Sequence, residues 1–157
     1  MTAVDAGGAL ALSGEAQEVA LAEAQAVLAM ARDDDYRARL AEVVAAVNEG
    51  EVPGAEAELL QELLELGLQS GRVRAVYGPS GEQAALKLYR RLPRGAELVE
   101  SAHEVSRALE SLAAKRLESI SLQAVGPGSF SLTVAAEGVE VSIRLDRQGA
   151  RLSSVGV

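Results

Sequence analysis

Apolar residues recur at helical spacing along most of the chain up to residue 112, and at strand spacing after it. In the segment 36–47, intervals of four, three and four place the apolar residues on one helical face. From residue 120 onward nearly every second residue is apolar, which is typical of half-buried strands. We therefore predict an α+β protein, in which an N-terminal bundle of about four to five helices precedes a long helix packed on a four-stranded antiparallel β-meander.

The helical half is predicted to contain three helices before residue 70. The first begins near Ser13, and residues 16–31 are so rich in Ala, Val, Leu and Met that most of their circumference must be covered. The second follows Asp33–Asp35, which we interpret as a cap and not a metal site, and ends at Gly50, which suits the left-handed C′ position. The third, 54–69, sets a Leu-rich face against an acidic one. The polar stripe that we expect on the first helix consists of Glu18, Gln25 and Arg32.

Residues 71–95 carry the only dense cluster of positive charge, with six basic side chains and a single acidic one. The preceding residues 1–70 carry fourteen acidic side chains and three basic ones. The formal net charge of −8 therefore hides an acidic half followed by a basic junction. Such an asymmetry influences association and solubility and does not determine the fold.

Residues 72–92 are compatible with two kinds of secondary structure. In the helical interpretation, which we favour, one or two turns end at Gly78, and a second helix continues to Pro93. Ser80 and Gln83 then have the spacing of a capping box at the start of that second helix. In the alternative interpretation, the same residues form a β-hairpin.

The alternative gives the chain a resemblance to a known family. It makes residues 72–77 and 84–91 the strands of a wing, preceded by LLELGL at 63–68 and followed by LPRGAEL at 92–98. This arrangement resembles winged-helix regulators of the MarR or PadR type, which implies binding to DNA. However, the segment that matches their recognition helix, 54–69, contains no Arg or Lys to contact phosphates or base edges.

The last part of the chain indicates one long helix and then four strands. From Ala96 onward, apolar residues recur at alternating intervals of four and three, as in a single helical seam. Three turn sequences then separate four alternating segments, each with one apolar face that the long helix can cover. A phase slip after Leu152 predicts a bulge or an edge strand. The seam of the long helix consists of Leu98, Ala102, Val105, Leu109 and Leu112.

Two sets of junction residues are candidates for binding. The loop Gly78–Gly81 precedes a predicted helix N-terminus, where free N–H groups favour an anion. The candidate anion-binding residues are Arg74, Ser80 and Gly81. The candidate partner-binding residues are Arg90, Arg91 and Arg94, although cations at a helix C-terminus are already favoured by the helix dipole.

The sequence offers little support for catalysis. The chain has no cysteine, so disulfides, thiol nucleophiles and cysteine-ligated metals are excluded. Its single histidine, His103, neighbours Glu104 in sequence, and adjacent side chains do not face each other on a helix. We therefore expect a protein that is not an enzyme and that holds no cofactor and no metal.

We expect a flexible lead-in at 1–14, a helical subdomain at 15–95, and a helix plus β-meander at 96–157. Neither a signal peptide nor a membrane span is recognisable, so we expect a soluble cytoplasmic protein that does not bind membranes. The favoured function is a non-enzymatic protein–protein interaction or self-assembly module, with a protein partner or a homo-oligomer. The alternatives are a degenerate winged-helix regulator or other nucleic-acid-binding protein, which the acidic helix disfavours, and a small-ligand-binding helix-plus-sheet domain.

Overall fold

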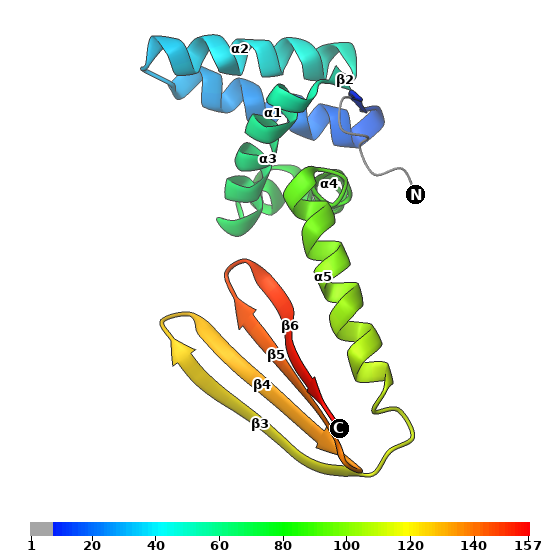
Figure 1. Cartoon of the computed structure of the whole chain (residues 1–157). Coiled ribbons are helices and arrows are strands. Elements are labelled where there is room, and N and C mark those ends of the chain that lie inside the picture. The colour runs from blue at the N-terminus through cyan, green and yellow to red at the C-terminus, as the bar shows by residue number, and fades with distance from the viewer. Residues whose placement is uncertain (1–7) are drawn as a thin grey trace. The chain divides into compact units, whose positions relative to one another are not determined.

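The computed structural model describes residues 8–157 and contains helices followed by an antiparallel sheet (Figure 1). The chain divides into two compact units, Met1–Ala96 and Glu97–Val157, one residue beyond the expected boundary. The predicted α+β class is confirmed, as is the order of helices first and the four-stranded antiparallel sheet last. No helix among residues 8–157 is long and apolar enough to cross a membrane.

The first unit is a helical bundle with a small two-stranded sheet. Its core is aliphatic, and α2 contributes Leu40, Val43 and Val47 on the face that the sequence predicts. Small side chains such as Ala20 and Ala24 are fully buried on α1, where they allow neighbouring helices to approach closely. The elements are β1 (Leu10–Ala11), α1 (Gly14–Met30), α2 (Asp34–Glu49), β2 (Glu51–Val52), α3 (Gly54–Gln69) and α4 (Arg72–Tyr89).

The predicted flexible lead-in is corrected in part. Residues 1–7 of it lie outside the described residues, but β1 pairs with β2 in antiparallel register, with Leu10 opposite Val52. The Leu12 N–H also donates to the Gly50 carbonyl at 2.8 Å, and the side chains of Leu10 and Leu12 are buried in the bundle core. The reason is that two alternate leucines supply enough apolar surface to hold this segment against the helices.

Helix termini follow the predicted local chemistry at two places. Asp33 is the N-cap of α2, and its carboxylate accepts a hydrogen bond from the Tyr36 N–H at 2.8 Å. Gly50 ends α2 in the left-handed conformation, with φ of 80°. That conformation is strained for residues with a Cβ, so a glycine is favoured there.

Residues 72–77 and 84–91 are not the strands of a wing. The first segment and residues 84–89 of the second lie in α4, and Arg90 and Arg91 form a turn after it. α4 is interrupted only at Gly78, whose φ of 71° and ψ of −175° are not helical. The predicted capping box is wrong, because the helix resumes at Pro79 and the Ser80 hydroxyl donates to the Glu15 carboxylate at 2.8 Å. Proline is well suited to a first helical position, since it has no N–H that needs a partner.

The second unit combines most of α5 (Pro93–Glu110) with a meander of four strands in the order β3-β4-β5-β6. Val105 on α5 packs against Val141 and Ile143 on β5, and the Ser101 hydroxyl donates to the Ala150 carbonyl of β6. The predicted irregularity is confirmed in β6, where the register skips Ser153. The strands are β3 (Leu117–Gly126), β4 (Ser129–Ala136), β5 (Val139–Asp146) and β6 (Gly149–Gly156).

Candidate functional site

The predicted anion-binding residues already have partners within the first unit. The Arg74 guanidinium donates to the Glu82 carboxylate at 2.7 Å, and the Ser80 hydroxyl donates to the Glu15 carboxylate. Gly81 is buried, and a Cβ at this position would overlap the Tyr77 side chain. An anion would therefore meet two carboxylates where the sequence suggested free donors, and the candidate anion site remains an untested prediction.

The three predicted partner-binding arginines lie around the turn between α4 and α5. The Arg94 side chain forms an ion pair with Glu65 at 3.2 Å, and its backbone N–H donates to the buried Gln61 side chain at 2.7 Å. Arg91 donates to the Ala11 carbonyl at 2.9 Å, whereas Arg90 is exposed. Two of the three arginines thus fasten this turn to α3 and β1. Their role in binding a partner stays a prediction, because these contacts all lie within one chain.

The expected polar stripe on α1 omits the most deeply buried charged residue of the described chain, Glu23, whose exposed fraction is 1%. Its carboxylate accepts hydrogen bonds from the Arg72 guanidinium at 2.5 Å and from the Tyr77 hydroxyl at 2.9 Å. Gly67 on α3 leaves room for it, because a Cβ there would lie 2.8 Å from a Glu23 oxygen. We call Glu23, Gly67, Arg72 and Tyr77 the carboxylate clamp.

The carboxylate clamp joins α1, α3 and α4 and is saturated with partners. Burial raises the pKa of the Tyr77 hydroxyl, and the hydrogen bond to Glu23 and the repulsion by its negative charge raise that pKa further. No buried side-chain nitrogen or oxygen in the described part of the chain lacks a hydrogen-bond partner. Because its carboxylate is already paired with a cation and a hydroxyl, the clamp is suited to holding helices together.

In the second unit, one helix covers only part of a four-stranded sheet. A helix with its side chains is about 10 Å wide, whereas the axes of four strands span about 14 Å. α5 packs over β5 and its neighbours, and every residue of β3 from Leu117 to Val125 is exposed. On the β3 side of the face that α5 covers, the large exposed apolar side chains, which we call the β3 strip, are Leu117 (53% exposed), Ile120 (59%), Leu122 (60%) and Phe130 (41%). At the other edge of the same face, Val155 of β6 is also exposed.

The same apolar row therefore changes from buried to exposed as it crosses the sheet. Leu122 of β3 lies opposite Leu132 of β4, which lies opposite Ile143 of β5. Ile143 is buried under α5, Leu132 is half-buried, and Leu122 is exposed. The sequence predicted the apolar face correctly, but the alternation does not show how many strands one helix covers.

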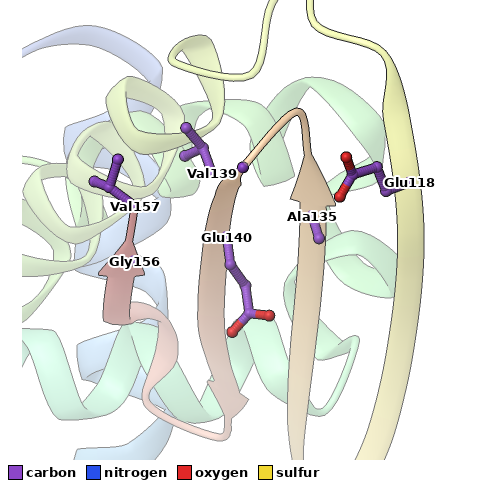
Figure 2. A pocket seen from close by; sticks show the side chains of 7 residues that line it. Glu118, Ala135, Val139, Glu140, Gly156 and Val157 are labelled. Atoms are coloured by element: carbon purple, nitrogen blue, oxygen red, sulfur yellow. The ribbon is translucent and has the colours of Figure 1, made fainter.

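The opposite face of the sheet is polar and carries a shallow, open depression of about 360 Å³ near one end. Figure 2 shows Glu118 and Glu140 on either side of Ala135, each on a different strand. The depression offers two carboxylates, and no cationic side chain lines it. No group of three or more His, Cys, Asp or Glu side chains in residues 8–157 could hold a metal ion. The remaining lining residues are Gly138, Val139, Gly156 and Val157.

No protein-family model, no curated protein and no solved structure matches this chain. Its function therefore has to be argued from its own geometry. Of the surfaces described, the β3 strip is the one whose exposure is energetically unfavourable unless something covers it.

Proposed function

We propose that this protein is a non-enzymatic interaction module that self-associates or docks a protein partner through the β3 strip. The observation that supports the proposal is the exposure of Leu117, Ile120 and Leu122 on a strand that no other element of the second unit covers. Each of these side chains is already partly buried, so covering the remainder would stabilise a complex by about 1 kcal/mol per residue. Contiguous exposed apolar side chains of this kind are typical of protein–protein interfaces.

The basic junction is less suited to docking, because three of its six basic side chains already form ion pairs within the first unit. Arg72 pairs with Glu23, Arg74 with Glu82, and Arg94 with Glu65. An acidic partner would have to compete with these carboxylates. We therefore expect association to depend on apolar contact and to persist at high salt, where exposed ion pairs are screened.

The other two functions have no comparable observation in their favour. Residues 72–77 and 84–89, which the alternative interpretation assigned to the strands of a wing, are helical, so the part of the nucleic-acid hypothesis that relied on a wing loses its basis. The depression on the polar face is open and acidic, which gives a small ligand little enclosed surface.

Light scattering after size exclusion tests the proposal on the full chain, over a wide range of protein concentration at low and high salt. We expect the average mass to rise above the 16.3 kDa of one chain as concentration increases, at both salt concentrations. The double substitution Ile120→Ser and Leu122→Ser should return the protein to a monomer. Both side chains are mostly exposed, so the variant should keep the helix and strand content of the parent.

The matched control is the double substitution Leu66→Ser and Val76→Ser in the first unit, where both side chains are also mostly exposed. It removes a similar amount of exposed apolar surface and should leave the mass unchanged. A monomer at every concentration, with no effect of either double substitution, would contradict self-association through the β3 strip.

A further inference from the structure

The two edge strands of the sheet differ in how their free backbone groups are protected. β6 carries Arg151, a bulge at Ser153 and a terminal glycine, Gly156, all of which discourage pairing with another strand. β3 is ten residues long and has register irregularities at Glu118 and Val125, but its stretch from Ser119 to Ala124 is regular and contains neither a charged residue nor a proline. The outer N–H and C=O groups of β3 are therefore available to another strand.

The exposed apolar residues of β3 form a pattern that is nearly symmetric about Ser121. Within the regular stretch, Ile120 and Leu122 lie one residue before and one residue after Ser121, both on the face that α5 covers. When two such strands pair in antiparallel orientation around Ser121, Ile120 lies opposite Leu122, and Ser119 lies opposite Gln123. The strand is thus complementary to a second copy of itself.

We infer that two copies of the chain pair through β3, antiparallel and centred on Ser121, to form a continuous eight-stranded sheet. This inference rests on the proposed interaction function and names its partner as a second copy of this chain. A two-fold axis perpendicular to the sheet at Ser121 keeps the apolar faces of both copies on the same side. Cross-strand contact between Ile120 and Leu122 then shields the flanks of both side chains.

The charges near β3 permit this pairing. Centring on Ser121 pairs the regular stretch 119–123 with itself, and this stretch carries no charged residue, so no like charges are opposed. The second unit is also close to neutral, with six basic and eight acidic side chains, whereas the acidic excess of the chain lies before residue 71. Approach of two sheets along β3 is therefore opposed less strongly than approach of two helical units.

The size of the contact sets its strength. An edge of ten residues is smaller than the roughly 20–30 residues per side of a standard stable interface. The dimer should therefore form at high protein concentration and dissociate on dilution. In this arrangement the pairing shields only the flanks of Ile120 and Leu122, and the ends of their side chains that point away from the sheet stay accessible.

The absence of native cysteines gives a direct test by disulfide cross-linking of the full chain. Directly opposed residues in antiparallel strands have Cα atoms about 4.5–5.5 Å apart, which is within the range of a disulfide. Ser121→Cys should cross-link to itself rapidly and nearly completely under mild oxidation. The matched control is Ser154→Cys, because register through Thr133 and Ser142 places Ser154 in the same row on the other edge, and it should cross-link only slowly.

A charge exchange at the same position provides the second test. Ser121→Lys and Ser121→Glu should each be monomeric at concentrations where the parent is a dimer, because like charges then face each other across the axis. An equimolar mixture of the two variants should form a mixed dimer. Since Ser121 is exposed, neither change should disturb folding of the monomer.

The outcomes distinguish a failure of strand pairing from a failure of the proposed association through the β3 strip. If Ile120→Ser with Leu122→Ser abolishes a dimer but Ser121→Cys cross-links no faster than Ser154→Cys, the β3 strip is used in another way and strand pairing is wrong. Dimers of unaltered stability in Ser121→Lys would also overturn the pairing. If the parent chain is a monomer throughout, the pairing and the self-association on which it rests are both contradicted.

Discussion

The helical unit and the sheet unit bury their apolar residues to very different extents. In the helical unit, buried side chains from α1, α2, α3 and α4 form one core, and even a glutamate is enclosed with its partners. In the sheet unit, the buried cluster beneath α5 consists of Val105, Val141 and Ile143, and β3 lies outside it. The comparison indicates that the first unit encloses its apolar core and that the second leaves part of its apolar face exposed.

The largest effect is expected at the carboxylate clamp. Arg72→Ala leaves Glu23 buried and without its cation, which should cost about 3–5 kcal/mol of unfolding free energy. Arg74→Ala, two residues away, removes an ion pair on a mostly exposed side chain and should cost about 0–1 kcal/mol. Urea unfolding followed by circular dichroism measures both, and equal losses would show that the clamp contributes no more than a surface pair.

Two substitutions in one row of the sheet compare its covered and uncovered parts. Ile143→Ala should destabilise the sheet unit by about 2–5 kcal/mol, because it leaves a cavity beneath α5. Leu122→Ala in the same row should change the stability by about 0.5 kcal/mol or less when measured on the dilute monomer. A loss at Leu122 as large as that at Ile143 would mean that β3 is covered within a single chain.

Tyr77 gives a pH-dependent test of the clamp. Tyr77→Phe removes a hydrogen bond to a buried carboxylate and should cost about 1.5–3 kcal/mol at neutral pH. Because the pKa of Tyr77 is raised in the folded state, its contribution is complete below the unfolded pKa of about 10 and is lost as pH rises through the folded pKa. The parent should therefore lose stability at alkaline pH more steeply than Tyr77→Phe.

The matched control is Tyr36→Phe, since the Tyr36 hydroxyl makes no hydrogen bond to the residues that the structure describes. Chemical denaturation of the three proteins from neutral to alkaline pH gives the comparison. Identical alkaline slopes for the parent and Tyr77→Phe would contradict the role of Tyr77.

The smallest of these effects concerns the space that Gly67 leaves for Glu23. Gly67→Ala should destabilise the helical unit by about 1–3 kcal/mol, because the new methyl group meets the Glu23 carboxylate and the Val73 side chain, each at 2.8 Å. Gly54→Ala, where the methyl group meets nothing within 4 Å, should be neutral or stabilising by up to about 1 kcal/mol. Thermal unfolding distinguishes them, and equal effects would show that the close approach at Gly67 is unimportant.

The sequence predicted those features that depend on neighbouring residues. The left-handed Gly50, the cap at Asp33, the meander and the irregularity near Ser153 follow from local spacing and turn chemistry. Glu23 was missed because its partners, Arg72 and Tyr77, are about fifty residues away in sequence. Local spacing does not show such partners, and a glutamate among alanines has the same pattern whether it is buried or exposed.

Two other errors have the same origin. The capping box at Ser80 fails because its hydroxyl donates to Glu15, 65 residues away, and the order of Leu10 depends on pairing with Val52. The exposure of β3 was also not predictable, because alternation identifies an apolar face but does not reveal how much of it one helix covers. The candidate interaction surface therefore required the structure.

Hydrogen exchange of the backbone amides in β3 and β6, measured on dilute and concentrated protein, tests the central claim most directly. If β3 pairs with a second copy, peptides covering Leu117–Gly126 should become protected as concentration rises, because their outer N–H groups gain partners. Peptides covering Gly149–Gly156 should exchange at the same rate in both samples. Unchanged exchange in β3, or protection that rises equally in both edge strands, would contradict the assignment of β3 as the interface.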